Sequence, residues 1–119
     1  MNTFSDFKTE VIQAVSHDDG DSFEFVKAED ITYDGAPYFV SNPFPLADGS
    51  VRFYSFQLHP SEFRSFLTTD GLTWEDEGQV YLKYEEGKNP LEGYYIKDPV
   101  VVQLEDGSYL MVYVTRAPY

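Results

Sequence analysis

The amino-acid sequence predicts an all-β chain built from repeated antiparallel units, with no helix of significant length. Aromatic residues make up 18% of its 119 residues, and their bulk suits the half-buried surface of a sheet. Short strand-like runs are separated by Asp-Gly turns, which are among the strongest short-range signals for a β-hairpin. One turn pattern also occurs twice in the chain, which indicates a repeated unit.

The repeated turn covers residues 16–23 and again 68–74. In both copies a hydroxyl residue, an Asp, a Gly, a second hydroxyl residue and an aromatic residue follow in this order, and the first copy has one extra residue before its Gly. We expect each Asp carboxylate to accept hydrogen bonds from backbone N–H groups just ahead of it, and each Gly to take a positive φ. Phe23 and Trp74 should then point into the core and anchor the turn.

The strand-like runs predict eight strands: a first hairpin (10–15 and 23–26), a four-stranded unit (38–46, 51–56, 62–67 and 74–82) and a last hairpin (95–104 and 109–114). Segments 27–37 and 83–93 are expected to be connections. The sequence Leu-x-Asp-Gly-Ser occurs in the turns of both 46–50 and 104–108, and an Asn-Pro or Asp-Pro pair precedes each. The last hairpin therefore corresponds to the first half of the four-stranded unit.

Both turns resemble the Asp-box, or BNR repeat, of sialidase-like β-propellers. The shorter second copy also resembles a turn of five-bladed glycoside hydrolases of the arabinanase, β-xylosidase and invertase type. The resemblance covers nearly the whole of a single domain, 1–119, and implies propeller-type blades of four antiparallel strands: a back half-blade (10–28), a full blade (38–82) and a front half-blade (95–115). Its motif residues, expected to be structural, are Ser16, Asp18, Gly20 and Phe23 in the first box and Thr68, Asp70, Gly71 and Trp74 in the second.

Two blades' worth of strands cannot close a propeller, because propellers have about four to eight blades. We therefore expect either that the chain is a portion of a longer protein or that it self-associates. In the second case a dimer or a trimer would form, with the front half-blade of one copy paired to the back half-blade of the next. Such pairing would also cover strand edges that are otherwise unprotected.

The resemblance places ligands on the face formed by the connections between blades and between each blade's second and third strands. Asp98 is the candidate catalytic residue on that face, because Asp98-Pro99 resembles the start of an inner strand in the arabinanase- and invertase-type hydrolases. Such enzymes need two carboxylates about 5–9 Å apart, and Glu92 or Glu62 is the expected partner. The alternative is that Asp98 only caps the end of a strand.

Further candidate ligand-binding residues lie on the same expected face. Asn42 occupies the place equivalent to Asp98, and His59 follows the second strand of the full blade. Tyrosine rings can stack on sugars, and an arginine can bind a carboxylate sugar. Solvated loop side chains and packing between blades are the alternatives, and for Arg52 and Arg64 we expect cross-strand charge pairs. The remaining candidates are Tyr94, Tyr95, Tyr119 and Arg116.

The composition argues against several classes of partner. The formal net charge is −13, with 21 acidic and 8 basic residues, which disfavours nucleic acid and anionic membranes as partners. No apolar run approaches the ~20 residues of a membrane span, and the first residues show no signal peptide. A cytoplasmic protein is the resulting expectation, although related propeller hydrolases are often secreted. With no Cys and two His, no metal or other cofactor is expected.

These features together predict a carbohydrate-directed propeller module. The first interpretation is a portion of a glycoside-hydrolase-like or sialidase-like protein that is catalytically incomplete by itself. The second is a non-catalytic, lectin-like oligomer with sugar sites between blades. The third is a structural or interaction scaffold without a ligand.

Overall fold

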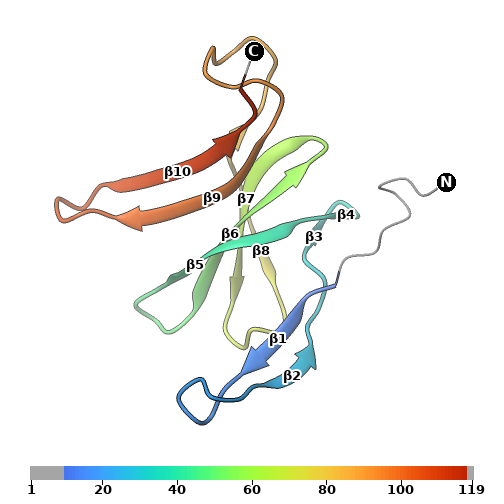
Figure 1. Ribbon diagram of the computed structural model, residues 1–119, viewed down its shortest axis with the longest axis vertical. Helices are drawn as coiled ribbons and strands as arrows, with labels where there is room; N and C mark the ends of the chain where they lie inside the picture. Colours follow the sequence, from blue (N-terminus) through green and yellow to red (C-terminus); the bar gives the residue numbers. More distant parts are fainter. Residues whose placement is uncertain (1–9, 118–119) are drawn as a thin grey trace.

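A computed structural model describes residues 10–117 of the protein, and this part of the chain is all-β (Figure 1). Ten strands and no helix are present in it, so the prediction of an all-β chain is confirmed for these residues. Accordingly, no helix in the described range could cross a membrane.

The centre of the molecule is a four-stranded antiparallel sheet in sequence order. It consists of β5 (Phe39–Pro45), β6 (Val51–Leu58), β7 (Ser61–Thr68) and β8 (Glu75–Lys83). Successive side chains of a strand point to opposite faces of the sheet, so Phe66 on β7 faces one side and Phe63 the other. Because both faces of β7 are covered, seven of its eight residues are buried.

Two hairpins flank the central sheet on opposite sides (Figure 1). One is β1 (Ile12–Val15) with β2 (Glu24–Lys27), and the other is β9 (Ile96–Gln103) with β10 (Tyr109–Thr115). Each hairpin is a separate two-stranded sheet. The second of these packs through β9 on the central sheet, whereas the strands of the first project from it with every residue but Gln13 exposed.

The face toward the first hairpin carries the small apolar core. Ile31, Tyr38 and Phe66 are buried together there, and Val11 and Trp74 pack against them. On the other face, the ring of Phe63 meets that of Tyr113 on β10 edge to face, with 5.5 Å between ring centres. Side chains from the central sheet also bond to the backbone of β9: Ser41 donates to the carbonyl oxygen of Pro99 at 2.9 Å.

Two expectations from the sequence were wrong. The segment 27–37 is not a simple connection, because it contains two further short strands, β3 (Thr32–Tyr33) and β4 (Ala36–Pro37), which form their own hairpin. Phe23 does not anchor its turn in the core, since it is 49% exposed. The sheet of β1 and β2 has no third strand in the described chain, whereas the ring of Trp74 lies 5.2 Å from that of Phe53 on β6, a further strand of its own sheet.

Candidate functional site

Two of the connections predicted to share a face converge at one end of the molecule, which we call the loop end, whereas Glu29 in the third, 27–37, bonds to Leu72 of the β7–β8 turn. The loop end comprises the β6–β7 turn with His59, the segment 84–95 and Arg116 after β10. Backbone bonds hold these pieces together: Tyr84 N–H donates to the carbonyl oxygen of Ser61 at 2.8 Å. The Tyr84 hydroxyl in turn donates to the carbonyl oxygen of Gly93 at 2.7 Å. The loop end is thus built from three separate parts of the chain.

Gly93 allows the segment 84–95 to approach the backbone at the end of β10 closely. A Cβ atom at this position would lie 2.1 Å from the carbonyl oxygen of Arg116 and 2.6 Å from that of Ala117. Both are backbone atoms, so a side chain would force the segment 84–95 away from the end of β10. The hydroxyl of Thr115 also links the two pieces, because it donates to the carbonyl oxygen of Tyr95 at 2.7 Å and accepts from Gly93 N–H at 3.3 Å.

Asp98 has an unusual backbone for a residue within a strand. Its φ is +53°, in the left-handed region, and the pairing of β9 with β10 shifts register at this point, between Val112 and Val114. Pro99, which follows, is buried, whereas Asp98 itself is exposed. Its carboxylate has no hydrogen-bond or ion-pair partner among the described residues. The bulge therefore presents a free carboxylate at the start of β9.

Neither expected partner carboxylate is free in the same way. Glu92 accepts a hydrogen bond from the hydroxyl of Tyr113 at 2.7 Å, and this bond, followed by burial, raises the pKa of Tyr113 to about 12. Glu62 is buried and accepts a hydrogen bond from the hydroxyl of Tyr38 at 2.5 Å. Its side chain lies on the face toward the first hairpin, whereas β9 packs on the opposite face. The structure therefore does not bring Glu62 together with Asp98.

The other candidate residues fall into two groups. At the loop end, Tyr94 is exposed and carries the guanidinium of Arg116 over its ring, 4.7 Å from the ring centre. The ammonium of Lys97 lies 5.7 Å from the ring centre of Tyr95, and His59 is exposed. Asn42, in contrast, is half-buried and donates from its side-chain amide to the carbonyl oxygen of Val101 at 3.2 Å, joining the central sheet to β9. Tyr119 lies outside the described residues.

A buried polar cluster was not predicted as a unit. The guanidinium of Arg64 contacts the carboxylate of Glu62 at 3.5 Å and that of Asp76 at 3.4 Å. It also lies 3.4 Å from the centre of the Tyr33 ring. Burial and the bond to Glu62 raise the pKa of Tyr38. The signal in the sequence was the pair of opposite charges two positions apart in a strand, which places both on one face.

The expected cross-strand charge pairing of the strand arginines is confirmed. Arg64 on β7 pairs with Asp76 on β8, as described above. Arg52 on β6 makes two bonds to Glu77 on β8, at 2.8 and 3.0 Å. The hydrogen bond from Arg52 lowers the pKa of Glu77 below its ordinary value.

The repeated turns lie between strands and use their Asp side chains as hydrogen-bond acceptors. Asp70 accepts from the N–H groups of Leu72 and Thr73 at 2.8 and 2.9 Å, and these bonds lower its pKa. Asp18 accepts from the hydroxyl and the N–H of Ser22, which lowers its pKa to about 2. Gly20 and Gly71 have φ values of +89° and +72°.

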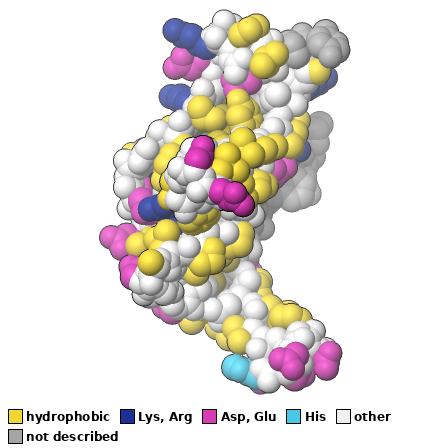
Figure 2. Space-filling model, turned by 90° about the vertical axis from the view of Figure 1, so that its left-hand side faces the viewer, with side chains coloured by type: hydrophobic (Ala, Val, Ile, Leu, Met, Phe, Trp, Pro, Cys, Tyr) yellow, Lys and Arg dark blue, Asp and Glu magenta, His cyan; other side chains and the backbone are white. Residues whose placement is uncertain are grey.

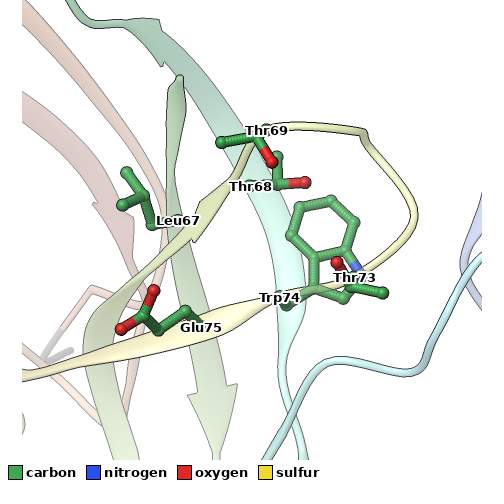
Figure 3. A pocket seen from close by; sticks show the side chains of 6 residues that line it. All are labelled: Leu67, Thr68, Thr69, Thr73, Trp74 and Glu75. Carbon is green, nitrogen blue, oxygen red and sulfur yellow. The ribbon is translucent and has the colours of Figure 1, made fainter. Parts of the chain in front are cut away.

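A small open pocket lies beside the second turn (Figure 3). Its volume is about 160 Å³, below the ~300–1,000 Å³ of typical ligand pockets. It is lined by Leu67, Thr68, Thr69, Thr73, Trp74 and Glu75. Because Trp74 and Thr68 are engaged in the turn, we interpret this pocket as a consequence of the turn and not as a ligand site.

Comparisons with protein-family models, with curated proteins and with solved structures gave no match for this chain. Within residues 10–117, no three His, Cys, Asp or Glu side chains gather in a way that could hold a metal ion. The functional side chains exposed at the loop end are the ring of Tyr94, the cations Arg116 and Lys88, His59 and the acids Glu85 and Glu86, and the free carboxylate of Asp98 lies on the adjoining strand β9.

Proposed function

We propose that the chain is a carbohydrate-directed module of propeller type that binds sugar at its loop end. The observation that carries this proposal is the free carboxylate of Asp98, exposed at a β-bulge in a left-handed conformation. Bulges re-aim side chains near functional sites, and backbone conformations of this kind cost of order 1–3 kcal/mol. A carboxylate held in this way suits hydrogen bonding to sugar hydroxyl groups.

Aromatic and cationic side chains near the start of β9 support the same class of ligand. Tyr94 and Tyr95 immediately precede β9, and the exposed ring of Tyr94 has one flat side that could stack on a sugar ring. Arg116 already lies against that ring and holds five N–H donors for ligand oxygens. The order of residues therefore places a stacking surface, donors and an acceptor along one short stretch.

The same geometry argues that the single chain does not hydrolyse glycosides. Hydrolysis needs a second carboxylate about 5–9 Å from the first. Glu92 is bonded to Tyr113, and Glu62 is buried on the other side of the central sheet. Neither of the two expected partners is therefore a free second acid for Asp98. The proposed module is therefore a binding unit that is catalytically incomplete.

The propeller-type arrangement is supported by the order of the sheets along the chain. A four-stranded antiparallel sheet lies between two hairpins whose turns match its own two halves. Face-to-face stacking of such sheets is what repeated blades require.

Binding is tested by NMR titration of the ¹⁵N-labelled chain with arabino-, xylo- and fructo-oligosaccharides and with sialyllactose. We expect chemical-shift changes at Tyr94, Tyr95 and Asp98, and weaker binding for Asp98→Asn. Glu105→Gln is the matched control, because it removes an exposed acid at the opposite end of the same hairpin. Absence of binding to all four sugars would overturn the proposal in favour of a scaffold.

Catalysis is tested separately with aryl glycosides. We expect no turnover by the chain alone. Turnover that disappears in Asp98→Asn would show that the chain is a complete hydrolase with a second carboxylate of its own.

A further inference from the structure

Eight of the ten strands of the described chain have one edge without a partner strand, and β1 and β10 are two of them. β1 pairs only with β2, and β10 pairs only with β9. In the central sheet, by contrast, β6 and β7 are each paired on both sides. The turns beside β10 and β1 match those beside β6 and β7.

The β9–β10 hairpin has the same turn as the β5–β6 hairpin. Leu46 N–H donates to the carbonyl oxygen of Ser50 at 2.8 Å, and Leu104 N–H donates to that of Ser108 at 2.8 Å. The Asp side chain of each turn accepts a bond from the N–H of its Ser, at 3.0 and 2.9 Å. The Gly residues of the two turns have φ values of +91° and +90°. β10 therefore occupies the place that β6 has in the central sheet.

The β1–β2 hairpin corresponds to β7–β8 in the same way. The Ser16 hydroxyl accepts a bond from Gly20 N–H at 2.8 Å, and the Thr68 hydroxyl accepts one from Gly71 N–H at 2.8 Å. In both turns the Asp carboxylate also accepts a bond from the N–H of the second hydroxyl residue, at 2.9 Å. β1 therefore occupies the place of β7, and the pairing between β6 and β7 has an unformed counterpart between β10 and β1.

The residue types on the free edges fit this counterpart. β1 (Ile12–Val15) and β10 (Tyr109–Thr115) contain no charged residue and no proline, although the chain carries a net charge of −13. The outer edge strands of the central sheet carry such protective residues: Pro43 and Pro45 on β5, and Glu75 and Asp76 on β8. The corresponding strands β9 and β2 carry them as well. Charges and prolines protect edges against pairing, so their absence marks β1 and β10 as edges meant to pair.

Exposed apolar side chains lie on the outward faces of both hairpins. Along β10, Leu110, Val112 and Val114 are exposed and alternate with half-buried residues that face the central sheet. On the other hairpin, Ile12 and Phe25 are 53% and 71% exposed. Figure 2 shows hydrophobic side chains gathered along one side of the molecule, with acidic side chains among and beyond them. A second sheet stacked on each hairpin would bury these side chains.

We propose that β10 of one copy pairs with β1 of a second copy, completing a four-stranded sheet in the order β9-β10-β1-β2. The pairing cannot form within one chain, because the two hairpins lie on opposite sides of the central sheet (Figure 1). The register follows from β6 and β7, where Val51 lies opposite Thr68 and Arg52 opposite Leu67. It sets Leu110 opposite Val15 of the second copy, and Met111 opposite Ala14 of the second copy.

This contact is head-to-tail, so it builds a ring if the rotation between copies closes. The central sheet of each copy then covers the outward hairpin face of its neighbour, and no apolar edge remains open. Each copy supplies one complete sheet and two halves. A closed ring of two or three copies has four or six complete sheets, within the range of about four to eight that such rings have.

The register is tested by disulfide crosslinking, which the protein suits because it contains no cysteine. Four single variants are made: Leu110→Cys, Met111→Cys, Ala14→Cys and Val15→Cys. They are mixed in pairs and oxidised mildly. The matched mixtures are Leu110→Cys with Val15→Cys and Met111→Cys with Ala14→Cys. Because adjacent pairs in an antiparallel sheet alternate, one of the two is a non-hydrogen-bonded pair, which has the shorter Cα separation. The mismatched control mixtures are Leu110→Cys with Ala14→Cys and Met111→Cys with Val15→Cys. In these the two cysteines would lie on opposite faces of the sheet, because a one-residue shift turns a side chain to the other face.

We expect at least one matched mixture to give several-fold more crosslinked dimer than either mismatched one. Equal yields in all mixtures, or a preference for a mismatched mixture, would overturn the proposed register.

Association itself is tested by light scattering coupled to size exclusion at moderate salt, which screens the net negative charge. We expect a mass of two or three times the 13.7 kDa of one chain. Val112→Lys should give a single chain, because the residue is 60% exposed in one copy and covered in the ring. Leu91→Lys, at an exposed apolar residue outside both hairpins, is the control and should keep the wild-type mass. A folded wild-type monomer, or a Val112→Lys variant with the wild-type mass, would overturn the proposal.

Discussion

Trp74 donates its indole N–H to the backbone carbonyl oxygen of Glu29 across 2.8 Å. A second bond runs in parallel, from Glu29 N–H to the carbonyl oxygen of Leu72 at 2.7 Å. The turn between β7 and β8 is therefore bonded directly to the segment that follows β2. A motif that is local in sequence thus holds two separate sheets together.

Substitution of Trp74 should separate the two roles of its side chain. Trp74→Phe keeps the ring against Phe53 but removes the bond to Glu29, so we expect the free energy of unfolding to fall by about 0.5–1.5 kcal/mol. Trp74→Ala also removes the ring and should cost about 3–5 kcal/mol. Urea denaturation followed by tyrosine fluorescence measures both values. Equal losses for the two variants would contradict a separate contribution from ring packing.

Gly71 should tolerate a side chain less well than Gly49, although both have positive φ. A Cβ atom on Gly71 would lie 2.4 Å from the amide nitrogen of Gln13, whose bond to the carbonyl oxygen of Asp70 would then be lost. No atom lies within 4 Å of such a Cβ on Gly49. We expect about 1–2 kcal/mol of loss from backbone strain in Gly49→Ala, and more in Gly71→Ala.

The Gln13→Ala background is the control for this comparison. There Gly71→Ala should cost about as much as Gly49→Ala, because the side chain in the way is gone. An unchanged extra cost in that background, measured by chemical denaturation, would show that Gln13 is not the cause.

The turn carboxylates should make stability depend on acid pH. Hydrogen bonds hold the pKa of Asp18 at about 2 and lower that of Asp70. Because these values lie below the ~3.9 of an unfolded Asp, the carboxylates stabilise the folded state above about pH 4, and this stabilisation is lost as the pH falls toward 2.

We therefore expect the stability difference between the wild type and Asp18→Asn/Asp70→Asn to shrink from pH 5 to pH 2. Urea midpoints across this range measure it. Asp21→Asn, which removes one charge from the first turn, controls for the change in net charge. A difference that stays constant with pH would argue against these two carboxylates as its source.

Loss of the arginine should lower the free energy of unfolding more in the buried cluster around Arg64 than in the outer pair of Arg52 and Glu77. The side chains of Arg64 and Glu62 are each 9% exposed, so Arg64→Met leaves a carboxylate buried without its cation. We expect a loss of about 3–5 kcal/mol. Arg52→Met, where the partners are 26% and 22% exposed, should cost about 1 kcal/mol. Similar thermal and urea midpoints for the two variants would contradict the difference in burial.

Much of the fold could be predicted because its signals are local. The Asp-Gly turns and the alternating runs around them specify hairpins through short-range backbone bonds, and the central sheet follows its four predicted strands closely. The short hairpin of β3 and β4 was missed because two-residue strands have no alternation to detect. The candidate site was predicted in part: His59, Tyr94 and Arg116 do lie at the loop end, but nothing local indicated the left-handed backbone of Asp98.

By itself, then, the sequence determined the all-β class, the strands and the turns, since these depend on residues close together in the chain. Only the tertiary structure decided which face each side chain occupies and what covers it. Phe23 and Trp74 end equivalent turns, yet one is exposed and the other packs on Phe53, because the second turn belongs to a four-stranded sheet that includes β6, whereas β1 and β2 pair only with each other. Strand alternation gives β7 two faces, but only long-range packing decides what lies against each face. Glu62 is therefore on the face that meets Tyr38, away from Asp98.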